Sequence, residues 1–251
     1  DITDSRRIEA ALRERNEALE EADRLRTAFV SNMSYELRTP LTSIGGFAEM
    51  LAGGYAGELQ PTAIDYVRAI LESVNRLSGL IDNVLDLTQS DTGSLLLAEE
   101  RVDLHALCIE AAEDARSLAS AKSIAFAVDV DVSIGAITGD RRRLRQSLDN
   151  ILSNAFAYTP EGGRVLLHAA ADTQAALITV SDNGAGISAA EQARVFDRFH
   201  RLMAGGEGRG EAIGLGLPLA KQFVEAHGGA IELHSRPGEG TTVTIRLPRQ
   251  A

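Results

Sequence analysis

Cysteine, long apolar runs and an initiator methionine are what this sequence most clearly lacks. One cysteine among 251 residues, Cys108, excludes an intramolecular disulfide framework and a multi-cysteine zinc site, which fits a reducing compartment. No run approaches the roughly 18 apolar residues that span a membrane, and no signal-peptide pattern opens the chain. We therefore expect the cytoplasmic portion of a longer protein, with no membrane contact by this segment and any membrane anchor of the parent outside it.

Basic residues are outnumbered as well. The 25 Lys and Arg residues against 36 Asp and Glu give a formal net charge of -11. This balance argues against a nucleic-acid binder, because phosphate backbones need a basic footprint. Hydrophobic residues make up 44% of the chain, which is enough to bury a core, and the length suggests one large domain or two unequal ones.

Glycine is missing from the first 44 residues, and apolar residues recur there at alternating spacings of four and three. The recurring positions are Ile8, Leu12, Leu19, Ala22, Phe29 and Met33, continuing through Leu37, Leu41 and Ile44. This spacing predicts a coiled-coil seam, which Arg15 and Arg26 weaken because they fall on the same stripe. The alternative is a single amphipathic helix packed in a globule.

A second helical stripe follows a break at residues 53–61. Pro61 opens it, and its apolar positions are Ile64, Val67, Ile70, Leu71, Val74, Leu77, Ile81 and Leu85. Two long amphipathic helices with a short connection form an antiparallel hairpin. Such a hairpin exposes an apolar face, so we expect a homodimer in which two hairpins form a four-helix bundle.

The pattern changes after residue 94 from paired helices to mixed elements. Helical stretches near 103–120, 140–158 and 214–227 alternate with strand-like runs at 123–130, 163–171, 175–182, 230–235 and 241–247. This order predicts an α+β sandwich, with one mixed sheet covered by helices on one face. The predicted fold class of the whole chain is therefore α+β: a helical hairpin followed by an α/β sandwich.

Three short motifs in this second region suit a nucleotide. Asn150 and Asn154 are four apart on a helix, so two amide oxygens could hold a hard cation from one face. Asp182 follows a strand and precedes flexible glycines, which suits an adenine amino group. Gly214 and Gly216 open a helix, where free N–H groups favour phosphate. Taken singly, each motif has an ordinary alternative, namely a solvated face, an Asx turn or a packing contact.

The order of these motifs is more specific than any one of them. An Asn-x₃-Asn helix, an Asp-x-Gly-x-Gly turn, FDRF and then GLGL resemble the ATP-binding domain of sensor histidine kinases, of the class shared with gyrase, Hsp90 and MutL. The resemblance implies that Asn154, helped by Asn150, coordinates Mg²⁺, that Asp182 binds adenine, and that Phe196 and Phe199 anchor a lid at residues 200–213. The nucleotide-site residues it implies also include Tyr158, Gly184, Gly186, Ile187, Arg198, Gly214, Leu215, Gly216 and Leu217.

Two positions depart from that family's pattern. Ala157 stands where a Lys or Arg is usual, and Ala212 and Ile213 replace the small and hydroxyl residues usual before GLGL. A missing cation near the phosphates should weaken the transition state more than adenine binding. Arg198 and Arg201 remain as candidate phosphate partners, so nucleotide binding is better supported than fast catalysis.

The first region resembles the dimerisation and phosphotransfer domain of the same family. Residues 34–41 read SYELRTPL where the family has SHELRTPL, so Tyr35 stands at the position of the phosphorylated histidine. The resemblance implies three segments: a signalling coiled coil at 1–24 that follows an upstream PAS-like sensor, a phosphoacceptor-like domain at 25–93, and a catalytic domain at 94–251. It also implies a receiver-domain response regulator as partner.

Tyr35 should face solvent, because it lies nearly opposite the apolar stripe. Thr39 is one turn away and Glu36 is adjacent, so a hydroxyl, a carboxylate and a phenol form one cluster. A phenol with a pKa near 10 needs a base such as Glu36 before it attacks ATP. Passing phosphate from a phenol to an aspartate runs uphill by several kcal/mol, at about 1.36 per pKa unit over roughly six units.

Three hypotheses follow. The first is an ATP-dependent two-component kinase that autophosphorylates on Tyr35. The second is a kinase-shaped scaffold that docks a receiver domain and passes a conformational signal without chemistry. The third is a receiver phosphatase that depends on Glu36 and Thr39, whose spacing in this family is associated with hydrolysis of phosphoaspartate.

Overall fold

The computed structural model describes residues 2–91, 97–198, 200 and 214–249. The chain divides into two compact units, Asp1–Leu95 and Leu96–Ala251. Within the described residues, no helix is both long and apolar enough to cross a membrane. The predicted helical region followed by an α/β sandwich is confirmed, whereas the boundary between residues 24 and 25 stays a prediction.

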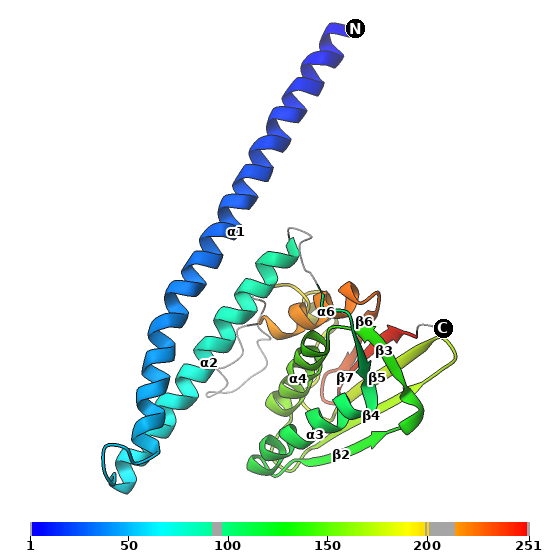
Figure 1. The fold of residues 1–251 in the computed structure, drawn as a ribbon. Coiled ribbons are helices and arrows are strands. Elements are labelled where there is room, and N and C mark those ends of the chain that lie inside the picture. Colours follow the sequence, from blue (N-terminus) through cyan, green and yellow to red (C-terminus); the bar gives the residue numbers. More distant parts are fainter. Residues whose placement is uncertain (1, 92–96, 199, 201–213, 250–251) are drawn as a thin grey trace. The chain divides into compact units, whose positions relative to one another are not determined.

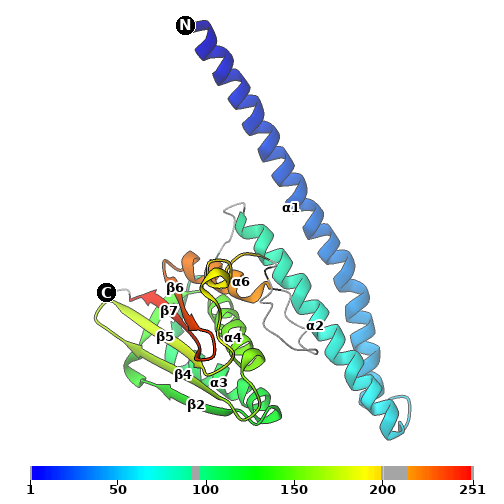
Figure 2. The same ribbon diagram turned by 180° about the vertical axis from the view of Figure 1, so that it is seen from behind.

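The first unit is an antiparallel helical hairpin (Figures 1 and 2). Helix α1 runs over Ile2–Ala52 and continues through Pro40, and helix α2 runs over Pro61–Asp91. The connection turns at Gly54 and Gly57, whose φ angles of +77° and +97° lie in the left-handed region that suits glycine. Both helices begin and end close to where the apolar periodicity and the break at residues 53–61 predicted.

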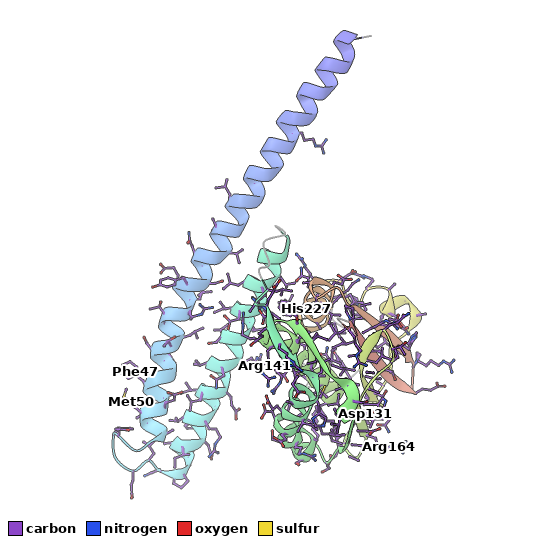
Figure 3. All side chains as sticks on the ribbon, turned by 45° about the vertical axis from the view of Figure 1, so that its right-hand side comes forward. Phe47, Met50, Asp131, Arg141, Arg164 and His227 are labelled. Atoms are coloured by element: carbon purple, nitrogen blue, oxygen red, sulfur yellow. The ribbon has the colours of Figure 1, made fainter. Side chains whose placement is uncertain are left out.

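Few side chains are buried between the two helices of the hairpin. On α1 they are seven residues apart, at Ser34, Leu41 and Ala48, and on α2 Val67 and Ile81 lie on one stripe. Asp86 and Leu87 are buried near the end of α2. Larger apolar side chains remain exposed beside this seam, among them Phe29, Met33, Leu37, Ile44, Phe47, Met50, Ile70 and Leu77. Phe47 and Met50 point away from α2 (Figure 3). A single hairpin therefore leaves an apolar face uncovered, as a subunit of a helical bundle would.

The second unit contains a five-stranded sheet in the order β2-β4-β5-β7-β6. Its strands are β2 Ala125–Val130, β4 Arg164–Ala171, β5 Ala175–Asp182, β6 Ala230–Arg236 and β7 Gly240–Pro248. Only the β2–β4 pair in this sheet is parallel. Helices α3 (Leu104–Ala121), α4 (Arg141–Tyr158) and α6 (Gly216–Ala226) cover one face (Figure 2).

The opposite face of the sheet is open to solvent. Burial alternates along β4, so that Val165, Leu167 and Ala169 enter the core while Leu166 and His168 face out. Polar pairs cross this outer face, such as Thr179 with Thr244 at 3.2 Å between hydroxyl oxygens. The predicted sandwich with helices on a single face is thus confirmed, and the core lies between that sheet and the three helices.

Several short elements were not predicted. Strands β1 (Glu100–Asp103) and β3 (Ala136–Gly139) form a separate two-stranded antiparallel sheet, and α5 covers only Ala189–Gln192. A 3₁₀ turn also lies at Val132–Ile134. Each of these pieces is four residues or shorter, which is too short for a hydrophobic period to appear in the sequence.

Candidate nucleotide site

Helix α4 carries the two asparagines of the first motif. Its N-cap is Asp140, whose Oδ1 accepts a hydrogen bond from the Arg143 main-chain N–H at 3.0 Å. Apolar residues such as Leu148 and Ile151 fix one side of the helix in the core. Asn150 and Asn154 are half-buried on an adjoining side. The helix periodicity therefore places Asn150 and Asn154 on the same side of α4.

Helix α6 brings the glycine-rich motif against Asn150. A Cβ atom on Gly216 would lie 3.5 Å from Cβ and Cγ of Asn150 and 3.6 Å from its Oδ1. Gly214 has a φ of +75°, and a side chain there would overlap the main chain of His200. The structure thus joins two motifs that lie about 65 residues apart in the sequence. Leu215 is buried at the N-cap of α6, and Leu217 packs on the core cluster.

The side chain of Asn150 has an unsatisfied polar atom. Its Nδ2 is buried and has no hydrogen-bond partner within the described ranges. The same described residues contain no cluster of three or more His, Cys, Asp or Glu side chains suited to a metal. Mg²⁺ takes oxygen ligands and usually keeps waters and phosphate oxygens, so the amide oxygens of Asn150 and Asn154 are of a kind that could hold it.

Asp182 ends strand β5 and is held by main-chain donors. Its Oδ1 accepts from the Gly184 N–H at 2.8 Å and from the Thr241 N–H at 3.3 Å. Its Oδ2 accepts no hydrogen bond from any described residue, so one oxygen is free for a ligand. Burial raises the pKa of the Asp182 carboxyl above its ordinary value of 3.8, although both main-chain hydrogen bonds act in the opposite direction.

The turn after Asp182 is packed too closely for larger residues. A Cβ on Gly184 would lie 2.5 Å from the Tyr158 carbonyl oxygen, and one on Gly186 would overlap the Arg236 carbonyl. The Ala185 N–H donates to the Tyr158 carbonyl at 3.4 Å. Ile187 is buried, and its N–H donates to Ser235 Oγ at 2.8 Å. The turn after Asp182 therefore packs directly against the end of α4 and is hydrogen-bonded to it.

The FDRF segment is partly described. The Phe196 ring is half-buried, and Lys221 Nζ from α6 lies 5.2 Å from its centroid, within the range of a cation–π contact. Arg198 is half-buried and makes interactions of its own. Phe199 and residues 201–213, which include Arg201, Ala212 and Ile213, lie outside the described residues. The predicted lid and its anchor at Phe199 stay predictions.

Lys122 lies against the end of α4, a contact that the sequence did not predict. Its ammonium donates to the carbonyls of Phe156 at 2.8 Å and Ala157 at 3.3 Å, at the last turn of α4. A cation at this helix end complements the helix dipole. Lys122 is the C-cap residue of α3, and its partner Phe156 lies 34 residues further along the chain. No local spacing in the sequence therefore predicts this contact.

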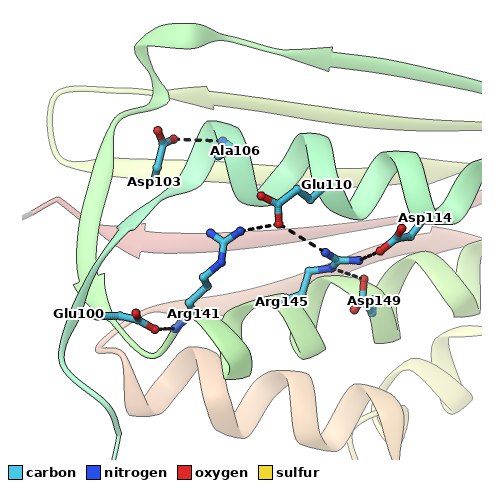
Figure 4. Close-up of polar contacts among 8 residues, drawn as sticks. All are labelled: Glu100, Asp103, Ala106, Glu110, Asp114, Arg141, Arg145 and Asp149. Carbon is cyan, nitrogen blue, oxygen red and sulfur yellow. Dashed lines mark hydrogen bonds and ion pairs between the residues drawn. The ribbon is translucent and has the colours of Figure 1, made fainter.

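An ion-pair network fastens α3 to α4 (Figure 4). Arg145 on α4 contacts Asp114 on α3 at 2.5 Å and Asp149 at 2.8 Å, while Arg141 contacts Glu110 at 2.5 Å. Burial acts against the charged form of Arg145, but hydrogen bonds to Asp149 and Asp114 outweigh it and raise the pKa of the guanidinium. These contacts hold the outer side of the helix that presents Asn150 and Asn154.

In the first unit, Tyr35 is 70% exposed on α1 and makes no side-chain hydrogen bond with a described residue. This confirms that the phenol faces solvent. Thr39 Oγ1 donates to the Tyr35 carbonyl at 3.3 Å, and Glu36 is exposed beside it. Arg38 pairs with Asp82 on α2 at 2.5 Å. The turn of α1 thus brings the hydroxyl of Thr39 to the main chain of Tyr35, while the Tyr35 phenol makes no hydrogen bond with a described residue.

Each of the two units matches a known protein family. Residues 25–93 match the His Kinase A (phospho-acceptor) domain, and residues 139–251 match the histidine kinase-, DNA gyrase B- and HSP90-like ATPase family. The chain belongs to the sensor histidine kinase family. It therefore carries the family's phosphoacceptor-type and ATP-binding-type domains in the usual order.

Its similarity to particular family members is extensive. Sensor protein DivL of Caulobacter vibrioides is 41% identical over 248 residues, which cover 99% of this chain and 31% of DivL. The circadian input-output histidine kinase CikA of Synechococcus elongatus is 36% identical over 224 residues, covering 88% of this chain and 30% of CikA. Full-length ShkA in complex with AMPPNP has a TM-score of 0.72 at 29% identity, over 88% of this chain and 46% of ShkA. The chain spans about a third of the length of these curated relatives.

Proposed function

We propose that this chain binds Mg²⁺-ATP in its second unit and transfers the γ-phosphoryl group to Tyr35 of the first. The observation that carries the nucleotide part is Asp182, whose Oδ1 is fixed by two main-chain N–H groups while Oδ2 stays available. An acceptor fixed in this way suits the amino group of adenine. The AMPPNP bound to the related protein ShkA supports the same class of ligand.

The remaining residues have separate roles in this proposal. Asn154, with Asn150 beside it, would hold Mg²⁺, which supplies positive charge to the phosphates when bound. Gly214, Leu215, Gly216 and Leu217 place the start of α6 close to Asn150, where main-chain N–H groups favour anions. Gly184 shapes the adenine turn against Tyr158, and Gly186 and Ile187 hold the turn against Arg236 and Ser235. Arg198 and Phe199 are proposed to contact the nucleotide from the other side.

The transfer step uses the first unit. The Tyr35 oxygen attacks the γ-phosphorus, the phenolic proton passes to the Glu36 carboxylate, and ADP leaves with the electrons of the broken bond. The exposure of Tyr35 supports this role, because an acceptor must be reached by a nucleotide from outside its own helix. The exposed apolar side chains of the hairpin, such as Leu37 and Ile44, support a homodimer in which the reaction takes place.

The product would be a stable phosphate ester, which is a poor phosphoryl donor. We infer that a receiver-domain response regulator, the partner class of two-component kinases, docks on the hairpin but receives phosphate inefficiently from Tyr35. An upstream sensor domain in the parent protein would set the state of α1. The modification would then act as a mark on the dimer more than as a relay intermediate.

A second function is favoured by the end of α4. Position 157 has no basic side chain, and the neighbouring ammonium of Lys122 is bound to the carbonyls of Phe156 and Ala157. With less positive charge free for the phosphates, the alternative is a nucleotide-bound scaffold that docks a receiver and transmits a conformational signal. Receiver phosphatase activity through Glu36 and Thr39 belongs to this alternative, and unchanged receiver dephosphorylation in Thr39→Ala would remove it.

One experiment separates these functions. The purified dimer is titrated with ATP and Mg²⁺ to measure binding, and then incubated with γ-labelled ATP and mapped for phosphopeptides. The kinase proposal expects saturable binding, label in the peptide that contains Tyr35, and no label in Tyr35→Phe or Asn154→Ala. Binding without label favours the scaffold. Label that persists in Tyr35→Phe contradicts Tyr35 as the acceptor, and absence of binding contradicts both.

A further inference from the structure

His227 joins the end of α6 to the start of α4. Its Nδ1 lies 2.6 Å from the Phe223 carbonyl oxygen, and its Nε2 lies 2.8 Å from the Asp140 main-chain nitrogen. A carbonyl oxygen only accepts, and a main-chain N–H only donates. The proton of the ring must therefore be on Nδ1, and Nε2 must be bare to accept from Asp140. The two contacts together fix His227 as the neutral Nδ1–H tautomer.

Gly139, the residue before Asp140, leaves room for the same imidazole. A Cβ atom at Gly139 would overlap Cδ2 of His227 and would lie 2.8 Å from its Nε2. The φ angle of Gly139 is not in the left-handed region, so backbone conformation does not require glycine there. The close approach of the imidazole does. Figure 3 marks His227 in the second unit, next to this end of the helix pair.

The contact lies at one end of an antiparallel helix pair. Asp140 is the N-cap of α4, and ten residues further along Asn150 meets Gly216 at the opposite end of α6. Between these ends, the guanidinium carbon of Arg143 lies 4.7 Å from the centroid of the Phe223 ring. These three contacts, spaced along the helix pair, therefore fix the axial register of α4 on α6.

We propose that His227 is a positioning residue for the nucleotide site. As a neutral acceptor for the Asp140 N–H, it fixes the register of α4 on α6 and so keeps Asn150 against Gly216. It touches neither nucleotide nor metal. This inference rests on the proposed nucleotide binding, and it assigns to a residue outside the three nucleotide motifs the task of holding two of them in line.

The test compares two substitutions at His227, one that supplies a hydrogen-bond acceptor and one that does not. In His227→Gln, the Oε1 oxygen can take the place of Nε2 and accept from Asp140, whereas His227→Leu fills the space without an acceptor. The matched control is Ile245→Val, a mild change in the sheet core that touches neither helix contact. We expect His227→Leu to weaken binding of a fluorescent ATP analogue by about 3–10-fold, the range of one net hydrogen bond. His227→Gln and Ile245→Val should stay within about 2-fold of wild type. Equal losses in both His227 variants would overturn the proposal.

Two further measurements do not depend on nucleotide. Nitrogen-15 spectra of the histidine-labelled chain should show a protonated Nδ1 and a bare Nε2 at His227, and a protonated Nε2 would overturn the geometry. Amide hydrogen exchange without ligand should rise along α4 and α6 in His227→Leu and not in Ile245→Val. If wild type binds no ATP analogue, the proposed function fails, and unchanged exchange in His227→Leu would separately overturn the positioning role.

Discussion

The candidate adenine-binding residue and the candidate phosphoacceptor are held in opposite ways. Asp182 is partly buried, and two main-chain N–H groups fix one of its oxygens. Tyr35 is 70% exposed, and its phenol has no partner within the described part of the chain. The second unit therefore builds its binding atoms from its own fold, whereas the first presents a side chain whose partners must come from elsewhere. A substitution at Tyr35 should change chemistry with little effect on folding, while one at Asp182 should disturb both.

The largest effect is expected for Asp182→Asn. The amide replaces one acceptor oxygen with an N–H donor, which can accept a hydrogen bond neither from the two main-chain N–H groups nor from the adenine amino group. Loss of one charged hydrogen bond should weaken ATP binding by about 10–100-fold, which titration calorimetry would measure. Asp172→Asn, at an exposed turn, serves as the control. ATP affinity within about 2-fold of wild type in Asp182→Asn would contradict the contrast between the fixed Asp182 carboxylate and the exposed Tyr35 phenol.

The pH dependence of the Asp182 site should have opposite signs for binding and stability. Burial raises the folded pKa above 3.8, so this carboxyl gains its proton earlier in the folded protein as the pH falls. Its contribution to stability is present below the unfolded value and is lost as the pH rises through the raised one. Nucleotide affinity should change the other way and weaken as acidification protonates the acceptor. Affinity that stays constant down to pH 4 in the wild type would contradict this assignment.

A smaller effect is expected for Lys221→Met. The change removes the cation–π contact with Phe196 and keeps a long side chain on α6. An exposed contact of this kind contributes about 0.5–1 kcal/mol, so nucleotide affinity should fall by about 2–5-fold. Lys221→Arg should retain affinity, and Glu225→Gln, which removes only the ion pair at 3.8 Å, should behave like wild type. An equal loss in Glu225→Gln would point to the helix instead of the ring.

The smallest effect is expected for the stability of Tyr35→Phe. Only an exposed hydroxyl without a partner in the described residues is removed, so unfolding free energy should change by less than about 0.5 kcal/mol. Thermal and urea unfolding of the dimer would measure it. A destabilisation above about 1 kcal/mol would show that the phenol has a structural partner in the dimer, and the contrast with Asp182 would then disappear.

The sequence predicted the parts of this molecule that repeat a local period or a dense motif. The hairpin followed from apolar spacing over α1 and α2, and the sandwich followed from alternating helical and strand-like runs. Contacts between segments distant in the chain could not be predicted from the sequence. Lys122 meets the end of α4 at a separation of 34 residues, and His227 meets Asp140 at a separation of 87. Neither lies in a pattern, because a single hydrogen bond to main chain requires no particular residue on the other side.

The direction of Tyr35 relative to the start of α1 depends on the length of the helix between them. Helix α1 is unbroken from Ile2 to Ala52, and at about 1.5 Å per residue Tyr35 lies about 50 Å along the axis from Ile2. Each residue turns the helix by about 100°, so one residue added upstream would turn the start of α1 by that angle relative to Tyr35, whose facing within the hairpin is fixed by the buried seam. Seven added residues would complete two turns to within about 20° and restore its direction. The angle of Tyr35 about the helix axis, relative to the start of α1, is therefore set by the number of residues between them. Any rotation applied to the start of α1 changes that angle.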